Sequence, residues 1–549
     1  MTMCDGRVRA PCAIPSKVRD LRVLVESSFN AEPTNHEGHA SVTITQQELE
    51  SRLWGAANAL RGPVDPADFK TYVFPMLFWK WISDTWVHEH DTALAKYGAE
   101  LDDDIESDFH RFEMPEGTLW STTTTTVKNL GAEISKTFQR IEKANPRSLS
   151  GVFGDASWGN KERIPESALV ELIKAFNKTK LDPTTVSHDL LGAGYEYLLK
   201  NFADESGKKA GEFFTPREVV NLLVGILEPQ PGESVYDPAC GSGGMLVATI
   251  NKIRDAGMDH RTLRLYGQEI NLTTSSIARM NLFLHEIEDF EIKRGDTLRT
   301  PAFKDAGGAL RRFDAVIANP PFSLANWGAD RWAADPRAKF GVPPAKNGDF
   351  AFVQHMLSSM KPGSGRVGVV MPHGVLFRGG AEGKIRRGLV ESDLLEAVIG
   401  LPSNLFYSTS IPACLLIFRD QKPANRKNRV LFIDGSARFS KRKNQNVMTE
   451  GDVAALINAY RNGEDSAGEH NEDSSAQIRL VPFSEIDSNG FDLNIGRYIK
   501  VAAEDAADLG TALVSYADAR QHRIDTEAAM FERLAAAGID LSLFEAVDE

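Results

Sequence analysis

The 549-residue sequence lacks any apolar run of the 18 or more residues that a membrane-spanning helix needs. Its N-terminal segment carries basic residues but no apolar stretch, so we expect no signal peptide and no membrane association. Cysteine is scarce, and Cys4, Cys12, Cys240 and Cys414 show no CxxC spacing. This scarcity predicts a cytoplasmic protein, argues against a structural zinc site, and leads us to expect no metal.

Positive charge is also in deficit, because 62 Lys and Arg face 76 Asp and Glu and give a net charge of −14. A protein that holds DNA alone usually shows a basic footprint. The acidic balance disfavours such a protein without excluding a role on DNA. A basic partner or a local basic patch would then have to supply much of the phosphate contact.

The sequence pattern predicts four parts. Residues 1–42 are polar and aperiodic, which indicates a disordered extension. Residues 45–185 show helical apolar spacing and predict a helical domain, in which Pro75 should kink or break an apolar helix. From 190 to 480 strands alternate with helices, and the predicted strands include "SVYDPA", "LRLYGQE", "FDAVIAN", "RVGVVMP", "LEAVIGLP" and "ACLLIFR". This alternation predicts a mostly parallel sheet that ends near residue 420 and is covered on both faces. Residues 481–549 contain an Ala-rich tail that predicts one or two long helices.

The stretch "GEFFTPREVV" precedes the first strand of this sheet. Thr215 followed by Glu218 predicts a capping box, with Pro216 at the first helical position. The aromatic pair Phe213 and Phe214 could form the wall of a site for a flat ligand. A well-capped helix without further function is the alternative.

The stretch "SVYDPACGSGGMLVAT" predicts a strand, a glycine-rich turn and a helix, where backbone N–H groups can meet the polar end of a ligand. It matches neither the dinucleotide fingerprint nor the P-loop, and a plain strand–helix turn is the alternative. Asp237 at the strand end suits a cation, whereas Cys240 is interpreted as a small turn residue. Glu269 ends the next strand and suits the hydroxyls of a ribose. Asp296 follows a third strand, where it either accepts from an exocyclic amine or caps a helix.

The decapeptide "FDAVIANPPF" ends a strand with two consecutive prolines, which removes hydrogen bonds from the ladder. In return it offers two rigid acceptors, the side-chain oxygen of Asn319 and the carbonyl of Pro320. Pro321 stiffens the segment, and Phe322 presents a flat face. Together these groups would grip a planar amine. A strand that merely ends in proline is the alternative.

These motifs, in the order "GEFFTP", "DPACGSGGM", "NPPF", resemble those of N6-adenine DNA methyltransferases that use S-adenosyl-L-methionine. More narrowly, "LWGAANALRG", "GDFAFVQHML", "VGVVMPHGVLFRGG" and "NGFDLNIGRYI" resemble the modification (M) subunit of type I restriction–modification systems. The resemblance covers residues 46–500. It implies an α/β fold, with a Rossmann-like methyltransferase sheet, an N-terminal all-helical domain and a C-terminal helical tail for subunit assembly.

The resemblance also implies roles for individual residues. The expected cofactor-lining residues are Glu212, Phe213, Phe214, Thr215, Pro216, Arg217, Ser242, Gly243 and Gly244. Glu269 would bind the cofactor ribose, Asp237 would lie by its methionine end, and Asp296 by its adenine. The catalytic segment of Asn319, Pro320, Pro321 and Phe322 would hold the target base.

The activity implied is methyl transfer to N6 of an adenine flipped out of double-stranded DNA. No long insert able to read base pairs follows the predicted sheet, and the resemblance assigns that role to a specificity (S) subunit. The resemblance implies that a second copy of the chain and a restriction (R) subunit complete the restriction–modification complex. The tail and "FDLNIGRYI" are candidates for docking onto the S subunit, with packing on their own domain as the alternative. Lys441, Arg442 and Lys443 either contact phosphate or form a solvated loop.

Two other functions fit the motifs. A glutamine N5-methyltransferase acting on protein would use the same pair of acceptors for an amide nitrogen. A non-catalytic assembly subunit would bind the cofactor as a regulatory ligand, although the intact "NPPF" argues against this.

Overall fold

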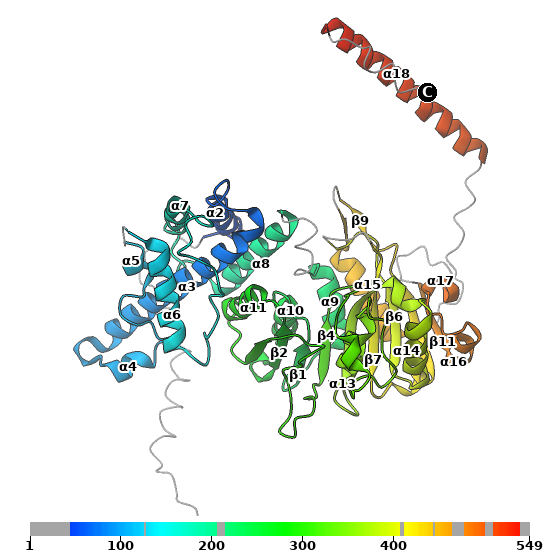
Figure 1. The fold of residues 1–549 in the computed structure, drawn as a ribbon, viewed down its shortest axis with the longest axis horizontal. Coiled ribbons are helices and arrows are strands. Elements are labelled where there is room, and N and C mark those ends of the chain that lie inside the picture. Colours follow the sequence, from blue (N-terminus) through cyan, green and yellow to red (C-terminus); the bar gives the residue numbers. More distant parts are fainter. Residues whose placement is uncertain are drawn as a thin grey trace, which may run out of the picture. The chain divides into compact units, whose positions relative to one another are not determined.

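The structure is a computed structural model that describes residues 44–125, 128–205, 215–406, 411–442, 445–463, 477–499 and 509–538 (Figure 1). The extension 1–42 and most of the polar linker after residue 460 lie outside these ranges. Within them, no helix combines the length and apolarity that crossing a membrane requires.

The first part of the described chain is helical, as predicted. Its α-helices are α2 (Gln46–Asn58), α3 (Phe69–Tyr97), α4 (Asp103–Ser107), α5 (Trp120–Thr123), α6 (Leu130–Ala144), α7 (Glu166–Phe176) and α8 (His188–Glu205). The first half of α3 is apolar on most faces and is buried, with Phe74, Phe78 and Trp79 fully enclosed. The predicted break at Pro75 is absent, because α3 runs on through it. The enclosing side chains hold the helix together where the proline removes one backbone hydrogen bond.

The core of these helices extends into α11 (Leu272–Leu284), a helix of the following sheet region, through residues such as Phe283. The Tyr195 hydroxyl on α8 donates to the carbonyl of Ile277 at 2.9 Å. Arg279 of α11 donates to backbone carbonyls of the loop that follows α6. The helical part is therefore packed directly against the sheet region rather than tethered to it.

A nine-stranded sheet forms the second part, in the order β11-β8-β6-β7-β5-β4-β1-β2-β3. Seven of its strands coincide with predicted ones: β1 (Ser234–Asp237), β2 (Arg264–Glu269), β3 (Phe290–Arg294), β4 (Ala315–Ala318), β5 (Arg366–Pro372), β6 (Leu395–Gly400) and β7 (Ala413–Arg419). Strand β7 is antiparallel between β5 and β6, and the neighbours of β1 and β4 are parallel to them. This is a mixed, mostly parallel Rossmann-like sheet.

The prediction that the sheet ends near residue 420 is wrong. The sheet continues with β8 (Arg429–Asp434), parallel to β6, and with β11 (Gln477–Pro482), antiparallel to β8. Strand β8 was not predicted from the sequence because basic residues surround its short apolar run. Two of them are buried and paired, Lys422 with Asp393 and Arg426 with Glu396, so they belong to the core rather than to a solvated segment.

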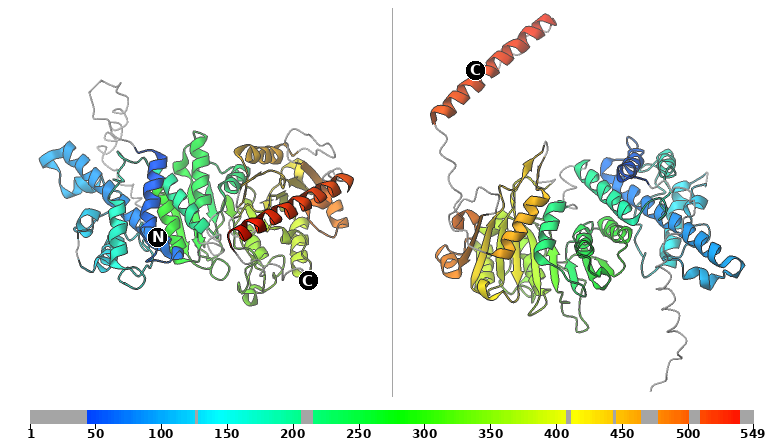
Figure 2. Two further views of the ribbon diagram at one scale, coloured as in Figure 1. Left: turned by 90° about the horizontal axis from the view of Figure 1, so that it is seen from above. Right: turned by 180° about the vertical axis from the view of Figure 1, so that it is seen from behind.

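Helices cover both faces of the sheet, as predicted (Figure 2). One apolar core lies against α9 (Arg217–Leu227), α10 (Gly244–Asp255), α11 and α15 (Glu450–Asn462). The other lies against α13 (Asp349–Ser358), α14 (Gly380–Glu391), α16 (Phe483–Ser488) and α17 (Ile495–Tyr498). A short helix, α12 (Ala329–Trp332), and a small ladder of β9 (Ser440–Lys441) with β10 (Asn446–Val447) complete these elements.

The stretch "FDLNIGRYI" packs on its own domain, which is the alternative to its predicted docking onto a partner. Phe491 and Leu493 are buried in the second core, and Tyr498 stacks on Phe432 with ring centroids 4.3 Å apart. The Ala-rich tail forms one long helix, α18 (Leu509–Ala536), which confirms the helical prediction. Its described side chains are almost all exposed, including Leu513 and Tyr516.

Candidate active site

The candidate site lies at the carboxyl edge of the sheet, between the neighbouring strands β1 and β4. The chain leaves β1 toward β2 and leaves β4 toward β5, so the strand order reverses here. Such a switch point leaves a crevice in which α/β proteins bind ligands. Asp237 ends β1, and Asn319 directly follows β4. The topology therefore brings together two motifs that are about eighty residues apart in the sequence.

The glycine-rich turn after β1 is held from several sides. Gly243 caps the start of α10 with a φ of 79°, a conformation that favours glycine. Asn281 of α11 donates from Nδ2 to the carbonyl of Ser242 at 3.0 Å. A Glu269 carboxylate oxygen accepts from the backbone N–H of Gly241 at 3.1 Å. These contacts fix the turn that the sequence predicted for close backbone approach to a ligand.

Asp237 is a buried carboxylate that needs a positive partner. It is 2% exposed, and its Oδ1 accepts from the N–H of Ala239 at 2.9 Å. Burial and, to a lesser extent, the charge of Glu269 raise the pKa of Asp237 to about 8. None of the ion pairs among the described residues includes Asp237. A cationic ligand would offset the cost of ionising this group, so its environment fits the positively charged methionine end of S-adenosylmethionine.

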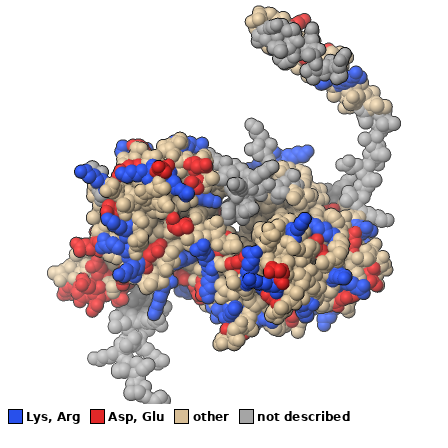
Figure 3. All heavy atoms as spheres, viewed as in Figure 1, with Lys and Arg blue, Asp and Glu red and all other residues tan. Residues whose placement is uncertain are grey.

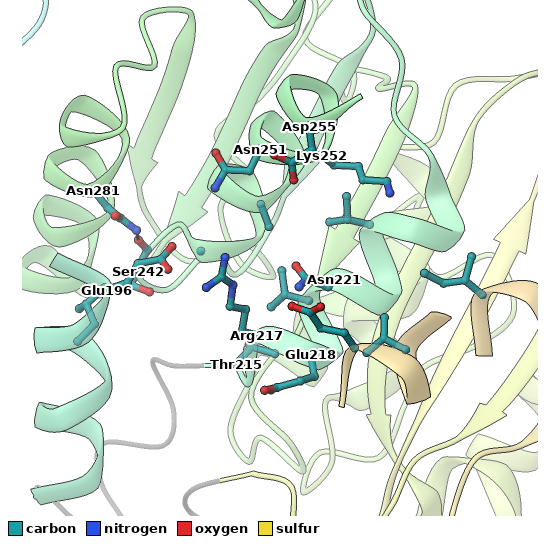
Figure 4. Close-up of a pocket in the computed structure, with 18 of the residues that line it drawn as sticks. Glu196, Thr215, Arg217, Glu218, Asn221, Ser242, Asn251, Lys252, Asp255 and Asn281 are labelled. Carbon is teal, nitrogen blue, oxygen red and sulfur yellow. Dashed lines mark hydrogen bonds between the residues drawn. The ribbon is translucent and has the colours of Figure 1, made fainter. Parts of the chain in front are cut away.

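Two adjoining cavities open beside this turn and share Thr215, Val220, Ser242 and Gly244. The smaller, of about 40 Å³, is also lined by Asp237, Ala239, Cys240, Gly241, Met245 and Asn319. The larger, of about 300 Å³, is bounded by residues of α8, α9, α10, α11 and α15. Figure 4 shows Arg217 pointing into the larger cavity between Ser242 and Asn221. Of the predicted cofactor residues, Thr215, Arg217, Asp237, Ser242 and Gly244 line one or both cavities.

The predicted capping box at Thr215 does not form. Helix α9 begins at Arg217, with Pro216 as its N-cap and no side-chain cap. The backbone N–H groups of Val219 and Val220 bond to the Pro216 carbonyl instead. This leaves the Thr215 hydroxyl free to turn toward β4, where its Oγ1 accepts from Nδ2 of Asn319 at 3.0 Å.

The contact with Thr215 sets the orientation of the Asn319 amide. Because Nδ2 is engaged, Oδ1 is left as an acceptor, and no described residue donates to it or to the Pro320 carbonyl. Asn319 is half-buried, whereas Pro320 is buried and Pro321 exposed. The end of β4 thus carries two unused acceptors, and Asn319 also lines the smaller cavity. That these groups bind a planar amine stays a prediction.

Phe322 lies half-buried after the two prolines and meets Phe406 edge to face, with ring centroids 6.1 Å apart and planes at 68°. The next residue, Ser323, has a φ of 52° and donates its N–H to Oδ1 of Asp349 at 2.6 Å. Arg378 donates to the other oxygen of Asp349 at 3.0 Å. The end of the segment is therefore anchored to α13, while the ring of Phe322 is buttressed on one side.

Some predicted site residues lie elsewhere. Asp296 uses both carboxylate oxygens on its own turn, accepting from Leu298 N, Arg299 N and Arg299 Nη1, each at 3.0 Å. It lines neither of these two cavities, and its predicted place by the cofactor adenine stays a prediction. Glu269 lies beneath the glycine turn and also accepts from Asn271 N at 2.9 Å. Glu212, Phe213 and Phe214 lie outside the described residues.

A buried polar network behind the site was not foreseen. Arg337 donates to the Thr297 carbonyl at 3.0 Å and lies 3.1 Å from Nδ1 of His355. The other ring nitrogen of His355 is 3.1 Å from the Tyr236 hydroxyl on β1. Burial and the charge of Arg337 lower the pKa of His355 to about 3, so the ring is neutral. This network ties the loop after β3 to β1, and its members are too far apart in sequence to be found by spacing.

Comparison with known proteins identifies the family. Residues 186–507 match the model of the N-6 DNA methylase family, and residues 49–176 match that of the HsdM N-terminal domain. The chain is 30% identical over 483 residues to the type I restriction enzyme MjaIX methylase subunit of Methanocaldococcus jannaschii, covering 83% of this chain and 85% of that protein. It is 34% identical over 383 residues to the HindI methylase subunit of Haemophilus influenzae, covering 68% and 83% respectively.

A solved structure agrees with these relatives. The type I restriction–modification methyltransferase subunit from Streptococcus thermophilus is 31% identical, with a TM-score of 0.72 over 83% of this chain and all of that one. Its likeness spans both the helical part and the sheet. The chain therefore belongs to the N-6 DNA methylase family and is an adenine-specific DNA methyltransferase of the type I modification-subunit class.

Proposed function

We propose that this chain transfers the methyl group of S-adenosyl-L-methionine to N6 of an adenine that has been flipped out of double-stranded DNA. The observation that carries the proposal is the pair of unused acceptors at the end of β4, Asn319 Oδ1 and the Pro320 carbonyl, because Asn319 lines the same cavity as buried Asp237. The acceptors at Asn319 and Pro320 would position an amine, and Asp237 would bind a cation. Both lie at the crevice between β1 and β4.

The cofactor would supply an activated methyl on a sulfonium, and the chain's own residues would bind it. Asp237 would stabilise the positively charged methionine end from within the smaller cavity. Thr215, Arg217, Ser242 and Gly244 line the space into which the rest of that end would extend. We assign the ribose to Glu269 from its place at the end of β2 and retain Asp296 as a prediction for the adenine.

The two acceptors have a direct chemical use. The lone pair of an aromatic amine is delocalised into its ring, which makes the nitrogen a poor nucleophile. Hydrogen bonds from both N–H groups to Asn319 Oδ1 and the Pro320 carbonyl would favour a pyramidal nitrogen with its lone pair directed at the methyl. As N6 gained the methyl, the C–S bond would break to leave a neutral thioether, and N6 would release one proton to solvent. Such catalysis depends on positioning and fixed dipoles rather than on a covalent intermediate with the protein.

An adenine stacked in a duplex cannot reach these acceptors, so the base must leave the helix. Phe322 would stack on the flipped ring, and Phe406 would hold Phe322 by its edge contact. A stacked base recovers about 1–3 kcal/mol, comparable with the few kcal/mol that unstacking costs. The half-buried ring of Phe322 is suited to this because Phe406 packs against it and part of the ring remains accessible.

Partners complete the proposed machine. The relatives are methylase subunits of type I restriction enzymes, which supports assembly with a specificity (S) subunit, a second copy of this chain and a restriction (R) subunit. The exposed apolar side chains along α18, including Leu513, Val514 and Tyr516, make it the candidate segment for docking the S subunit. A separate subunit that reads the sequence would also account for the acidic balance of this chain.

The proposal is tested by coexpressing the chain with its S subunit and incubating the complex with radiolabelled S-adenosylmethionine and either duplex DNA or cell protein. We expect label in DNA, recovered as N6-methyladenine on digestion. Label found only in protein would favour the glutamine N5-methyltransferase alternative. Cofactor binding without label in either substrate would favour the non-catalytic assembly subunit.

A further inference from the structure

A short basic hairpin projects from the sheet beyond β8. It comprises residues 438–442 and 445–447 and includes the ladder of β9 with β10, in which Lys441 pairs with Asn446. The sequence from 435 to 449 contains no Asp or Glu, while Arg438, Lys441 and Arg442 supply positive charge. Lys443, which the sequence had also suggested for phosphate contact, lies outside the described residues. Figure 3 shows Lys and Arg atoms on this projection, at the place that Figure 1 labels β9.

Strand directions place this hairpin at the same edge as the candidate site. Strand β8 is parallel to β6, both β6 and β5 are antiparallel to β7, and β5 is parallel to β4. The carboxyl end of β8, from which the hairpin follows, therefore shares its edge with the end of β4 that carries Asn319. Two other exposed cations of the same basic stretch, Lys427 and Arg429, lie at the amino end of β8, on the opposite edge.

The hairpin is joined to the wall of the proposed base site. Gln445 donates from Nε2 to the Leu405 carbonyl at 2.9 Å, and Asn446 donates from Nδ2 to the Ser403 carbonyl at 2.8 Å. The loop held in this way carries Phe406, whose ring meets Phe322. The position of the charges is thus fixed relative to the segment that would receive the flipped base.

The cations of the hairpin are available to a ligand. Lys441 and Arg442 are exposed, and neither takes part in an ion pair within the described chain. The contrast with Lys422 and Arg426, which are buried and paired in the same basic stretch, is sharp. Because the amides of Gln445 and Asn446 hold the hairpin against the Phe406 loop, these cations are presented from an anchored segment.

We propose that Lys441 and Arg442 bind backbone phosphates of duplex DNA next to the flipped adenine. This inference rests on the proposed function, since it assigns a phosphate contact to the edge at which that function places the base. Phosphate contacts of this kind orient a duplex without reading its sequence. They would give an acidic chain a local grip on DNA at the point where a base must be extracted.

The test compares two matched double variants of the complex with its S subunit. Lys441→Ala/Arg442→Ala removes two charges from the hairpin, and Lys427→Ala/Arg429→Ala removes two from the opposite edge. The KM for duplex DNA and kcat are measured from 50 to 200 mM salt, with cofactor affinity and the melting temperature as checks on folding. Each lost phosphate contact reduces the slope of log affinity against log salt by about 0.9.

For the hairpin variant we expect a higher KM for DNA at low salt, an unchanged kcat at saturating DNA, and a salt slope reduced by about 1.8. The ratio of its KM to the wild-type KM should then fall by about tenfold between 50 and 200 mM. The Lys427/Arg429 variant should keep the wild-type slope. If both variants behave like an active wild type, the hairpin assignment is wrong while the proposed function stands. A wild-type complex that methylates no DNA overturns both.

Discussion

The hydrogen bond from Asn319 Nδ2 to Thr215 Oγ1 leads to a sharp prediction for Thr215→Val. Valine has nearly the shape of threonine but cannot accept a hydrogen bond, so the cavity wall is preserved while Nδ2 loses its partner. An amide donor left unpaired in a partly buried site costs about 1–3 kcal/mol. The Asn319 amide would then be free to rotate and to present Nδ2, rather than Oδ1, to the target amine.

If about 1–2 kcal/mol of this loss is felt in the transition state, the rate constant of methyl transfer falls by about 5- to 30-fold, since each 1.36 kcal/mol is a factor of ten. The assay is single-turnover methylation of duplex DNA by the complex with the S subunit, at saturating cofactor. Cofactor affinity, measured separately by calorimetry, should change by less than twofold. Thr215→Ser keeps the hydroxyl and should retain most of the rate.

Two results would refute this reasoning. If Thr215→Val methylates DNA within twofold of the wild-type rate, the contact does not orient the amide. If instead its cofactor affinity drops while the single-turnover rate at saturating cofactor is preserved, Thr215 acts only as part of the cavity wall.

Two further variants test other parts of the account. Folding raises the pKa of Asp237 from an unfolded value of about 3.9 to about 8. Between these two pH values the carboxyl binds more protons in the folded state than in the unfolded state, so the free energy of unfolding should fall as the pH rises from 4 to 8. Cofactor binding needs the ionised form of Asp237, so the affinity for the cofactor should rise from pH 6 to 8 in calorimetric titrations. Asp237→Asn should abolish both pH trends. A wild-type affinity that does not change with pH contradicts the assignment. Phe406→Ala removes the edge contact with Phe322, which contributes about 0.5–1.5 kcal/mol. The variant should raise the KM for DNA by about 2- to 13-fold and leave the affinity for the cofactor unchanged. An unchanged KM would show that Phe322 does not need the contact with Phe406.

The sequence predicted the elements whose patterns are local. Most of the seven predicted strands are compact apolar runs between turn signals, although β3 is not. Asp237 and Asn319 lie at strand ends, as predicted, and the parallel pairing of β1 with β4 brings these ends to one edge of the sheet. Strand β8 was missed because its four apolar residues are flanked by cations whose acidic partners lie about thirty residues upstream, in the region of β6. Charge that is neutralised by tertiary packing cannot be recognised from a linear pattern.

Contacts between distant segments account for the remaining differences. Thr215 and Glu218 have the spacing of a capping box, but Asn319 lies opposite the Thr215 hydroxyl in the folded chain and takes it as an acceptor. Phe406 is likewise more than eighty residues from Phe322 in the sequence, and only the order of strands in the sheet brings their rings together. The local sequence shows which hydrogen bonds and ring contacts a residue can make. The order of the strands in the fold decides which of these contacts form.

The central claim is that Asn319 holds the amine that receives the methyl group. The most direct measurement compares the wild type with Asn319→Ala, each in complex with the S subunit, by calorimetry for S-adenosylmethionine and by mass spectrometry of nucleosides from duplex DNA. We predict that Asn319→Ala binds the cofactor within a few-fold of wild type and forms no detectable N6-methyladenine. Methylation by Asn319→Ala at a rate close to that of the wild type would contradict the account.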